Sequence, residues 1–505
     1  MDPILAADLE RFPELLADAR DRAVRALAGL ATRPVGVPPT MPEPAALPVE
    51  GVGAEGAAAR FHQRWEPGFS GSAGPRYLGF VTGGTTPAAL VGDWLTGTYD
   101  QNAVSAQDSS AAELERETVR WLGELFGLGG HHRGAFVSGA TMSNFTGLAI
   151  AREWAGERIG VSPAESGAGA LGDVPVLSGS PHSTIYKALS MLGLGRGAVR
   201  LVPTLPDREA VDVDRLEAAL AGLDGRPAIV VANAGTVNSV DFDDLRAIAE
   251  LRERFPFWLH VDGAFGAFAA LSPAHAHLVE GIDQADSVCV DLHKWLNVPY
   301  DSAVQFSTRP DLQVRIFQNS AAYLGLPGEN PDFVHLTPES SRRLRALPAW
   351  FALTAYGSAG HREIVERTVH LARFLGERVA ELPGLRMLAP VRFTSCASRW
   401  RTTRPRPRSP RWRTRSPRPA NSSSPRPSTR EYRRCGRRSA TGARPSRTSS
   451  ASSRQSRGFA HNTESARTGD PSPHATSGKP ALSTFSLVRA PDTRARTALR
   501  EHRTS

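Results

Sequence analysis

The sequence predicts an α/β protein whose mostly parallel sheet is covered by helices on both faces. From about residue 110 onward, short apolar runs alternate regularly with amphipathic helical stretches. Each run is only a few residues long and apolar almost throughout, which is typical of strands buried on both faces. In such sheets a ligand lies beyond the carboxyl ends of the strands, so the residues after each run are the site candidates.

The expected elements follow from this alternation. Apolar side chains at helical spacing predict an amphipathic helix over 3–30, and a Pro/Gly-rich linker follows over about 34–48. Further helices are expected over 111–128, 141–154 and 182–192. The strand candidates are 134–139, 174–180, 227–235, 257–265 and 287–292.

The end of the chain differs in composition from the rest. Positions 391–505 hold 27 Lys and Arg against 5 Asp and Glu, whereas positions 1–390 hold 33 basic and 46 acidic residues. The formal charge of +9 therefore belongs to this tail alone. No Leu or Ile occurs between Leu388 and Leu482, so the tail has almost nothing with which to build a core, and we expect it to be disordered.

Two explanations of the tail compete. An Arg/Ser/Pro-rich tail is one way to bind nucleic acid. Alternatively, the reading frame slips near residues 391–395, because the codons of an Ala/Gly/Val-rich chain from a GC-rich gene yield Arg, Pro, Ser and Thr out of register. Lys479 is the single lysine of the tail, which favours the slip, and specific nucleic-acid binding is not expected.

Only three cysteines occur, Cys289, Cys396 and Cys435, so a disulfide framework is not expected and a reducing cytoplasm fits. Neither a leader nor an apolar run of membrane-spanning length is found, and a soluble protein is expected. Four segments are expected along the chain: an N-terminal helical part with its linker (1–60), a large domain (61–310), a loop with the start of a smaller domain (311–390) and the tail (391–505).

Two strand candidates end in chemically active residues. His293 and Lys294 come just after the run 287–292, where a lysine is either an ordinary surface residue or part of a site. Asp262 ends the run before them, and a carboxylate so close to a core needs a partner. The alternative for Asp262 is a helix N-cap.

Three further turns are weaker candidates. Backbone N–H groups and hydroxyls at Thr141 and Ser143 would form a phosphate cradle at a helix start, although such turns also cap helices without a ligand. His182 opens a helix, where it could stack on a flat ring or simply cap. Thr236 follows its strand, where its hydroxyl could face the same space.

Five motifs carry a resemblance to a known family. SGATMSN, PHSTIYKA, NAGTVNS, HVDGAFG and DLHKWLNVPYD occur in the order found in the group II pyridoxal-5′-phosphate (PLP)-dependent amino-acid decarboxylases, the family of aromatic-amino-acid and glutamate decarboxylases. The resemblance runs from about residue 60 to residue 390. It implies fold type I of the PLP-dependent transferases, with a large domain, a smaller C-terminal domain that is incomplete here, and a homodimer with active sites at the subunit interface.

The resemblance also implies residue roles. Lys294 would be the Schiff-base lysine, with His293 beside it. Asp262 would pair with the pyridine nitrogen and keep it protonated, which strengthens the ring as an electron sink. The other implied cofactor contacts are a stacking His182, Ala264 under the ring, Thr236 near it, and Ala140, Thr141 and Ser143 at the phosphate; Asn144 stands where the aromatic decarboxylases usually carry Thr. Tyr77, Phe80 and Thr82 lie in a segment resembling the family's substrate-side loop.

The implied reaction is decarboxylation of an L-amino acid to the amine and CO2. An aromatic substrate is weakly favoured by Phe80 and Trp94. The family attributes the final proton to a loop tyrosine, and Phe333 aligns with it, near His335. Relatives without this tyrosine can divert the reaction to oxygen and release an aldehyde, so an aldehyde synthase is an alternative. For plain decarboxylation, His335 or Tyr323 would donate the proton instead.

Other classes remain open at this point. An aminotransferase would usually need a substrate-carboxylate arginine from the smaller domain, which the sequence does not identify. A catalytically impaired remnant is the other alternative, because the tail cannot complete the smaller domain. No metal site is expected.

Overall fold

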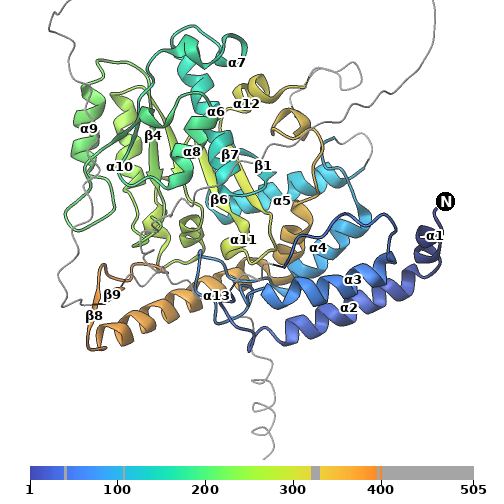
Figure 1. Ribbon diagram of the computed structural model, residues 1–505. Helices are drawn as coiled ribbons and strands as arrows, with labels where there is room; N and C mark the ends of the chain where they lie inside the picture. The colour runs from blue at the N-terminus through green and yellow to red at the C-terminus, as the bar shows by residue number, and fades with distance from the viewer. Residues whose placement is uncertain (39–41, 106–108, 320–329, 395–397, 401–505) are drawn as a thin grey trace, which may run out of the picture. The chain divides into compact units, whose positions relative to one another are not determined.

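The computed structural model describes residues 1–38, 42–105, 109–319, 330–394 and 398–400 (Figure 1). The tail beyond residue 400 lies outside the described residues, so its expected disorder stays a prediction. The helices are α1 (Pro3–Glu10), α2 (Phe12–Ala28), α3 (Gly53–Arg64), α4 (Pro87–Tyr99), α5 (Ala111–Leu125), α6 (Ala140–Arg158), α7 (Pro163–Ser166), α8 (Ser183–Met191), α9 (Val213–Ala221), α10 (Leu245–Glu250), α11 (Leu292–Trp295), α12 (Pro310–Phe317) and α13 (Ala346–Ala380). The strands are β1 (Arg133–Val137), β2 (Val176–Ser178), β3 (Val199–Leu201), β4 (Ala228–Asn233), β5 (Phe257–Asp262), β6 (Ser287–Asp291), β7 (Ala303–Ser307), β8 (Leu385–Met387) and β9 (Ser398–Trp400).

Within the described residues, one 7-stranded sheet has the order β1-β7-β6-β5-β4-β2-β3. Only β7 runs antiparallel to its neighbours β1 and β6, while the pairs from β6 to β3 are parallel. The predicted mostly parallel sheet is therefore confirmed. The sequence did not reveal β3 or β7, and β7 is the strand that joins β1 to the rest.

Helices cover both faces of the sheet, as Figure 1 shows. Along β4, Val230 belongs to the core formed with α5, α9 and α10, whereas Ile229 and Val231 belong to the core formed with α6 and α8. Neighbouring side chains of a strand point to opposite faces, which explains this division. The continuous apolar runs in the sequence reflect burial on both sides.

The predicted N-terminal helix is interrupted. The structure has two helices, and α1 ends at Glu10 while α2 begins at Phe12. Pro13 explains the break, because its ring lacks an N–H and would clash with the carbonyl of Leu9 in a continuous helix. Pro13 is instead in the first turn of α2, where a missing N–H costs nothing.

The packed chain continues through Thr394. Phe393 is fully buried, and its ring stacks on Trp295 with the centroids 5.1 Å apart. It also meets Phe242 and His275 edge to face. β9 pairs antiparallel with β8 at the end of the described residues. The segment boundaries at 60, 310 and 390 stay predictions.

Replacing Phe393 by Ala should lower the free energy of unfolding by about 3–5 kcal/mol, because the variant leaves a cavity beside Trp295. Phe374→Ala is the matched control, since Phe374 on α13 is 55% exposed and should cost little. Urea unfolding of both variants measures the difference. Equal losses would show that the segment around Phe393 does not pack on the large domain.

Candidate active site

The ends of β5 and β6 bring the predicted residues together. β5 ends at Asp262 and β6 at Asp291, and the two strands are parallel, with Asp262 opposite Cys289. The backbone N–H of Asp291 donates to the carbonyl of Ala264 at 2.9 Å. Two buried carboxylates therefore lie at the same edge of the sheet, where the alternation of strands and helices predicted a site.

Asp291 holds the predicted lysine. Lys294, on α11, places Nζ 3.0 Å from Asp291 Oδ2 and 5.5 Å from the ring centroid of Phe265. The other carboxylate oxygen accepts the N–H of Ala140, the first residue of α6, at 2.6 Å. The side chains of Lys294 and Asp291 are 17% and 5% exposed, so water screens this ion pair weakly.

Lys294 also differs from the other lysines of this chain. There are only three, at positions 187, 294 and 479. Lys187 is exposed on α8, and Lys479 lies outside the described residues. Lys294 alone of the two described lysines is enclosed beside a buried carboxylate.

His293 is fixed next to the lysine. Its Nδ1 lies 2.9 Å from the carbonyl of Ser302, and its ring is tilted against Tyr300 with the centroids 4.3 Å apart. Burial lowers the pKa of His293, while the nearby carboxylate of Asp291 partly opposes this effect. His293 is therefore a neutral ring at neutral pH.

The segment with the weak substrate candidates lies against this region. The hydroxyl of Thr82 donates to the carbonyl of Gly79 at 3.3 Å, and the side chain of Asn297 donates to the carbonyl of Gly83 at 2.9 Å. Tyr77 is close enough to Tyr300 to contribute to its raised pKa, which burial mainly causes. Phe80 is 81% exposed and has a φ of 56°, a strained value for a bulky residue. Their substrate contacts stay predictions.

Asp262 is held by two donors. The amide of Asn144 on α6 donates to Oδ2 at 3.0 Å, and the N–H of Ala264 donates to Oδ1 at 3.2 Å. Each oxygen keeps a free lone pair, so Asp262 can still accept a proton donor from a ligand.

His182 joins the same group through Thr184. Asn144 Nδ2 also donates to Thr184 Oγ1 at 3.2 Å, and this hydroxyl lies 2.8 Å from His182 Nδ1. His182 caps α8, because its Nδ1 accepts the N–H of Thr184. The capping alternative is therefore confirmed, and the stacking of His182 on a ring stays a prediction.

The phosphate cradle predicted from the sequence falls at the start of α6 and stays a prediction. An added Cβ on Gly139 would lie 3.6 Å from His293 Cε1 and 3.8 Å from Asp291 Oδ1, so a side chain there would fill the space before the helix. Thr141 is partly exposed in this first turn. Ser143, by contrast, is fully buried and donates to the carbonyl of Val304 at 3.0 Å. An oxyanion is favoured at this helix start by its N–H groups and dipole.

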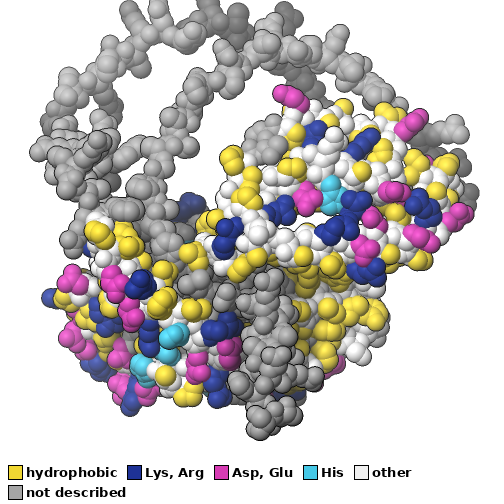
Figure 2. All heavy atoms as spheres, turned by 90° about the horizontal axis from the view of Figure 1, so that it is seen from below, with side chains coloured by type: hydrophobic (Ala, Val, Ile, Leu, Met, Phe, Trp, Pro, Cys, Tyr) yellow, Lys and Arg dark blue, Asp and Glu magenta, His cyan; other side chains and the backbone are white. Residues whose placement is uncertain are grey.

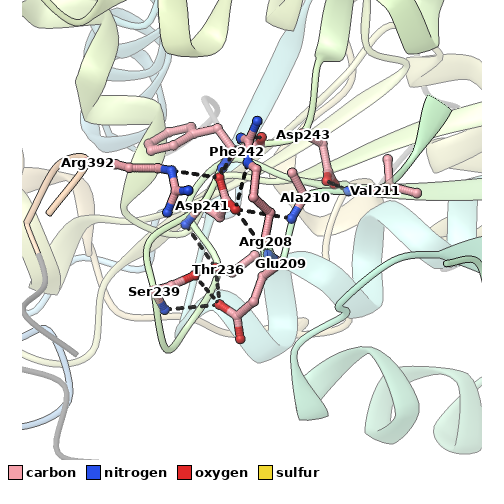
Figure 3. Close-up of polar contacts among 10 residues, drawn as sticks. All are labelled: Arg208, Glu209, Ala210, Val211, Thr236, Ser239, Asp241, Phe242, Asp243 and Arg392. Atoms are coloured by element: carbon pink, nitrogen blue, oxygen red, sulfur yellow. Dashed lines mark hydrogen bonds and ion pairs between the residues drawn. The ribbon is translucent and has the colours of Figure 1, made fainter. Parts of the chain in front are cut away.

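Thr236 is bound within a separate polar cluster (Figure 3). Its hydroxyl donates to Glu209 Oε2 at 2.5 Å and accepts the N–H of Asp241 at 2.9 Å. Glu209 also holds Ser239, and Asp241 pairs with Arg208 and Arg392 (Figure 3). Within the described residues, no contact joins the Thr236 side chain to Lys294 or Asp262.

Phe333 and His335 are buried away from these contacts. Both lie in a short 3-10 helix and are 1% and 2% exposed. The guanidinium groups of Arg116 and Arg342 lie 5.0 Å and 4.9 Å from the Phe333 ring centroid. The described contacts of both side chains include neither Lys294 nor Asp262. Tyr323, the other suggested proton donor, lies outside the described residues.

Sequence reasoning missed Asp291 and His260. Asp291 stands three residues before Lys294, a spacing that places both on one face of a helical turn and that could have identified it. His260 is two residues before Asp262, so both side chains point to the same face of β5. Its partners come from α6 and β6, and no local signal predicts them.

A lysine paired with a buried carboxylate, beside a second buried carboxylate at the edge of an α/β sheet, defines a site suited to carbonyl cofactors. Residues 54–398 match the family model described as the pyridoxal-dependent decarboxylase conserved domain. This chain therefore belongs to the pyridoxal-dependent decarboxylase family. The family is pyridoxal-dependent, so PLP is the cofactor.

Several relatives are similar in sequence. The aromatic-L-amino-acid decarboxylase of Bacillus atrophaeus is 29% identical over 60% of this chain and 63% of its own length. The L-2,4-diaminobutyrate decarboxylase of Acinetobacter baumannii is 28% identical over 64% and 67%. The 4-hydroxyphenylacetaldehyde synthase of Rhodiola rosea is 26% identical over 69% and 72%. This chain thus spans about two thirds of the length of these relatives.

Solved structures support the fold. A crystal structure of Oryza sativa TDC with PLP and tryptamine has a TM-score of 0.72 at 24% identity, covering 79% of this chain and 85% of that one. Mouse CSAD in apo form has a TM-score of 0.69 at 25% identity, covering 78% and 84%. These similarities establish the predicted fold class.

The described residues contain neither a membrane-spanning helix nor a metal-binding group. No helix among the described residues is long and apolar enough to cross a membrane. Nor do the described His, Cys, Asp and Glu side chains include a group of three or more that could hold a metal ion.

We predict that His260 makes the fold sensitive to acid. Burial lowers its pKa from 6.5 to about 4, so the unfolded chain binds a proton first as the pH falls. Its contribution to stability is therefore present above pH 6.5 and is lost towards pH 4, by about 3 kcal/mol. Asp243 acts in the opposite sense, since burial raises its pKa to about 6.

His260→Gln should therefore flatten the fall in unfolding free energy between pH 6.5 and pH 4. Urea unfolding at several pH values, compared with the wild type, isolates this term because Asp243 is present in both proteins. An unchanged pH dependence would show that His260 titrates normally in the fold.

Proposed function

We propose that this chain binds PLP through Lys294 and decarboxylates an L-amino acid to the amine and CO2. The observation that carries this proposal is the ion pair of Lys294 with Asp291 at the end of β6, the strand adjacent and parallel to the one that ends at Asp262. The relatives that the chain resembles act on aromatic and other amino acids, so the substrate class is part of the proposal. An aromatic amino acid is weakly favoured.

The donor set of the site fits PLP. Bound PLP supplies a Schiff-base-forming aldehyde and a ring that accepts the electrons of the broken Cα–carboxylate bond. Lys294 provides the amine, and the pair with Asp291 keeps Nζ in place. Asp262 provides the free lone pairs that hold a proton at the pyridine nitrogen. The start of α6 provides the N–H of Thr141 for the phosphate, next to Ala140, whose own N–H bonds to Asp291.

The remaining groups would orient the ring and line the space around it. His182 is fixed by Thr184, so its imidazole has one orientation in which to lie over a planar ligand. Ala264 is small and buried, which leaves space on the other side of the ring. His293 and Tyr300 form a partly enclosed wall next to Lys294.

An aldehyde synthase is the second candidate function. Phe333 has no hydroxyl and is buried between two guanidinium groups, so it cannot return a proton to Cα. In that case the substrate, O2 and water would give the aldehyde, CO2, ammonia and hydrogen peroxide. The similarity to the Rhodiola rosea synthase supports the alternative.

We also propose a homodimer in the cytoplasm. Within the described residues, no side chain of α1, α2 or α3 is buried. Their apolar residues Leu9, Phe12 and Leu16 are each more than half exposed. Figure 2 views the molecule from below, the side on which α2 and α3 lie in Figure 1, and hydrophobic side chains are visible there among many charged ones. Such a face is stabilised by a second subunit. The buried free thiol of Cys289 fits a reducing compartment.

Borohydride reduction with PLP should attach the cofactor to Lys294. Peptide mapping of the full chain can resolve this cleanly, because only three lysines are available. Lys294→Ala should abolish the adduct, whereas Lys187→Ala, at an exposed lysine, should retain it. Labelling at Lys187 alone, or none in a folded sample, would contradict the proposal and favour an impaired remnant.

Product analysis separates the two chemistries. With aromatic amino acids, we expect amine and CO2 in equal amounts. Aldehyde with hydrogen peroxide and ammonia would instead establish the synthase, and oxygen consumption measures the share of each route. Lys294→Ala is the control for reaction without the site.

A further inference from the structure

A hydrogen-bonded chain runs under the site from Trp258 to Asp262. Trp258 Nε1 donates to Ser287 Oγ at 2.9 Å, and Ser287 Oγ lies 2.8 Å from His260 Nδ1. His260 Nε2 lies 2.9 Å from Asn144 Oδ1. Asn144 then donates to Asp262 and to Thr184, as described above.

The two ends of this chain determine every proton between them. An indole N–H only donates and a carboxylate only accepts. Ser287 therefore accepts from Trp258 and gives its own proton to His260 Nδ1, which leaves the imidazole proton on Nε2. Asn144 must turn Oδ1 to His260 and its two N–H groups to Asp262 and Thr184.

The packing around His260 is adapted to its ring. Gly147 lies within α6, where glycine costs up to about 1 kcal/mol relative to alanine. An added Cβ there would lie 2.8 Å from both Cε1 and Nδ1 of His260, closer than real contacts allow. The helix therefore keeps space for an imidazole that is fully buried and bonded at both nitrogens.

We propose that His260 is a positioning residue that acts through Asn144 on both Asp262 and His182. By holding Oδ1 of Asn144, His260 aims one N–H at the carboxylate under the pyridine nitrogen. The second N–H orients Thr184 and so the ring of His182. This inference rests on the proposed PLP site. It assigns the orientation of groups around Asp262 and His182 to His260, a residue that does not itself contact the cofactor.

A matched pair of variants tests the inference in the full-length protein. His260→Gln places an amide nitrogen near the position of Nε2 and can still donate to Asn144, whereas His260→Asn places its amide near Nδ1 and cannot. Both lose the ring, so a purely structural role would affect them alike. Thermal unfolding without PLP measures that shared cost.

We expect the Asn variant to bind PLP about tenfold more weakly than the Gln variant, since Asn144 is then no longer held in the orientation in which it donates to the charged Asp262. The visible absorption of bound PLP should also change its pH profile in the Asn variant alone. Equal PLP affinities and profiles for the two variants, with binding by the wild type intact, would overturn the inference only. No PLP binding by folded wild-type protein would overturn the proposed function, and the inference with it.

Discussion

The burial of two carboxylates at the same edge of the sheet organises this molecule. Asp262 and Asp291 end adjacent parallel strands and are nearly inaccessible to water. A buried charge is stable only with donors and counter-charges, so each carboxylate requires its own set. Asp291 gathers Lys294, His293 and the start of α6, and Asp262 gathers Asn144 and the turn at Ala264. The proposed chemistry uses the same partners that make the burial possible.

The two sets have different electrostatic character. Asp291 is balanced by a formal cation, which is the group that the proposed chemistry converts. Asp262 is balanced by neutral donors within the described residues, and it keeps lone pairs for a ligand. Asp291 is therefore suited to holding the lysine, and Asp262 to holding a pyridine nitrogen.

The C-terminal segment contributes to this region from a distance in the sequence. Phe393 stacks on Trp295, the residue after Lys294, and Arg392 pairs with Asp241 in the cluster that binds Thr236. The family match likewise extends to residue 398. The packed part of the described chain therefore includes Arg392 and Phe393, which lie just after the change in composition at 391. The origin of the tail is still a hypothesis.

Much of the fold could be predicted because its signals are local. The apolar runs and helical spacings identified β1, β2, β4, β5 and β6 with their helices, and the residues after those runs included Lys294 and Asp262. β7 was missed because its short sequence, with buried Gln305, resembles neither an apolar run nor a clean alternation. The break at Arg11 was missed although Pro13 signals it, since apolar spacing continues through both helices.

The sequence by itself determined the α/β class, the strand ends and the residue types at the site, because periodicity and turn chemistry act over a few residues. Only the tertiary structure decided that Asp291 holds Lys294 against α6, that Thr236 bonds to Glu209, and that Phe333 lies between two arginines. It also decided that His260, buried by α6 at Gly147, bonds to Asn144. These choices depend on which side chains meet across elements distant in sequence, and on which buried polar groups must then find partners.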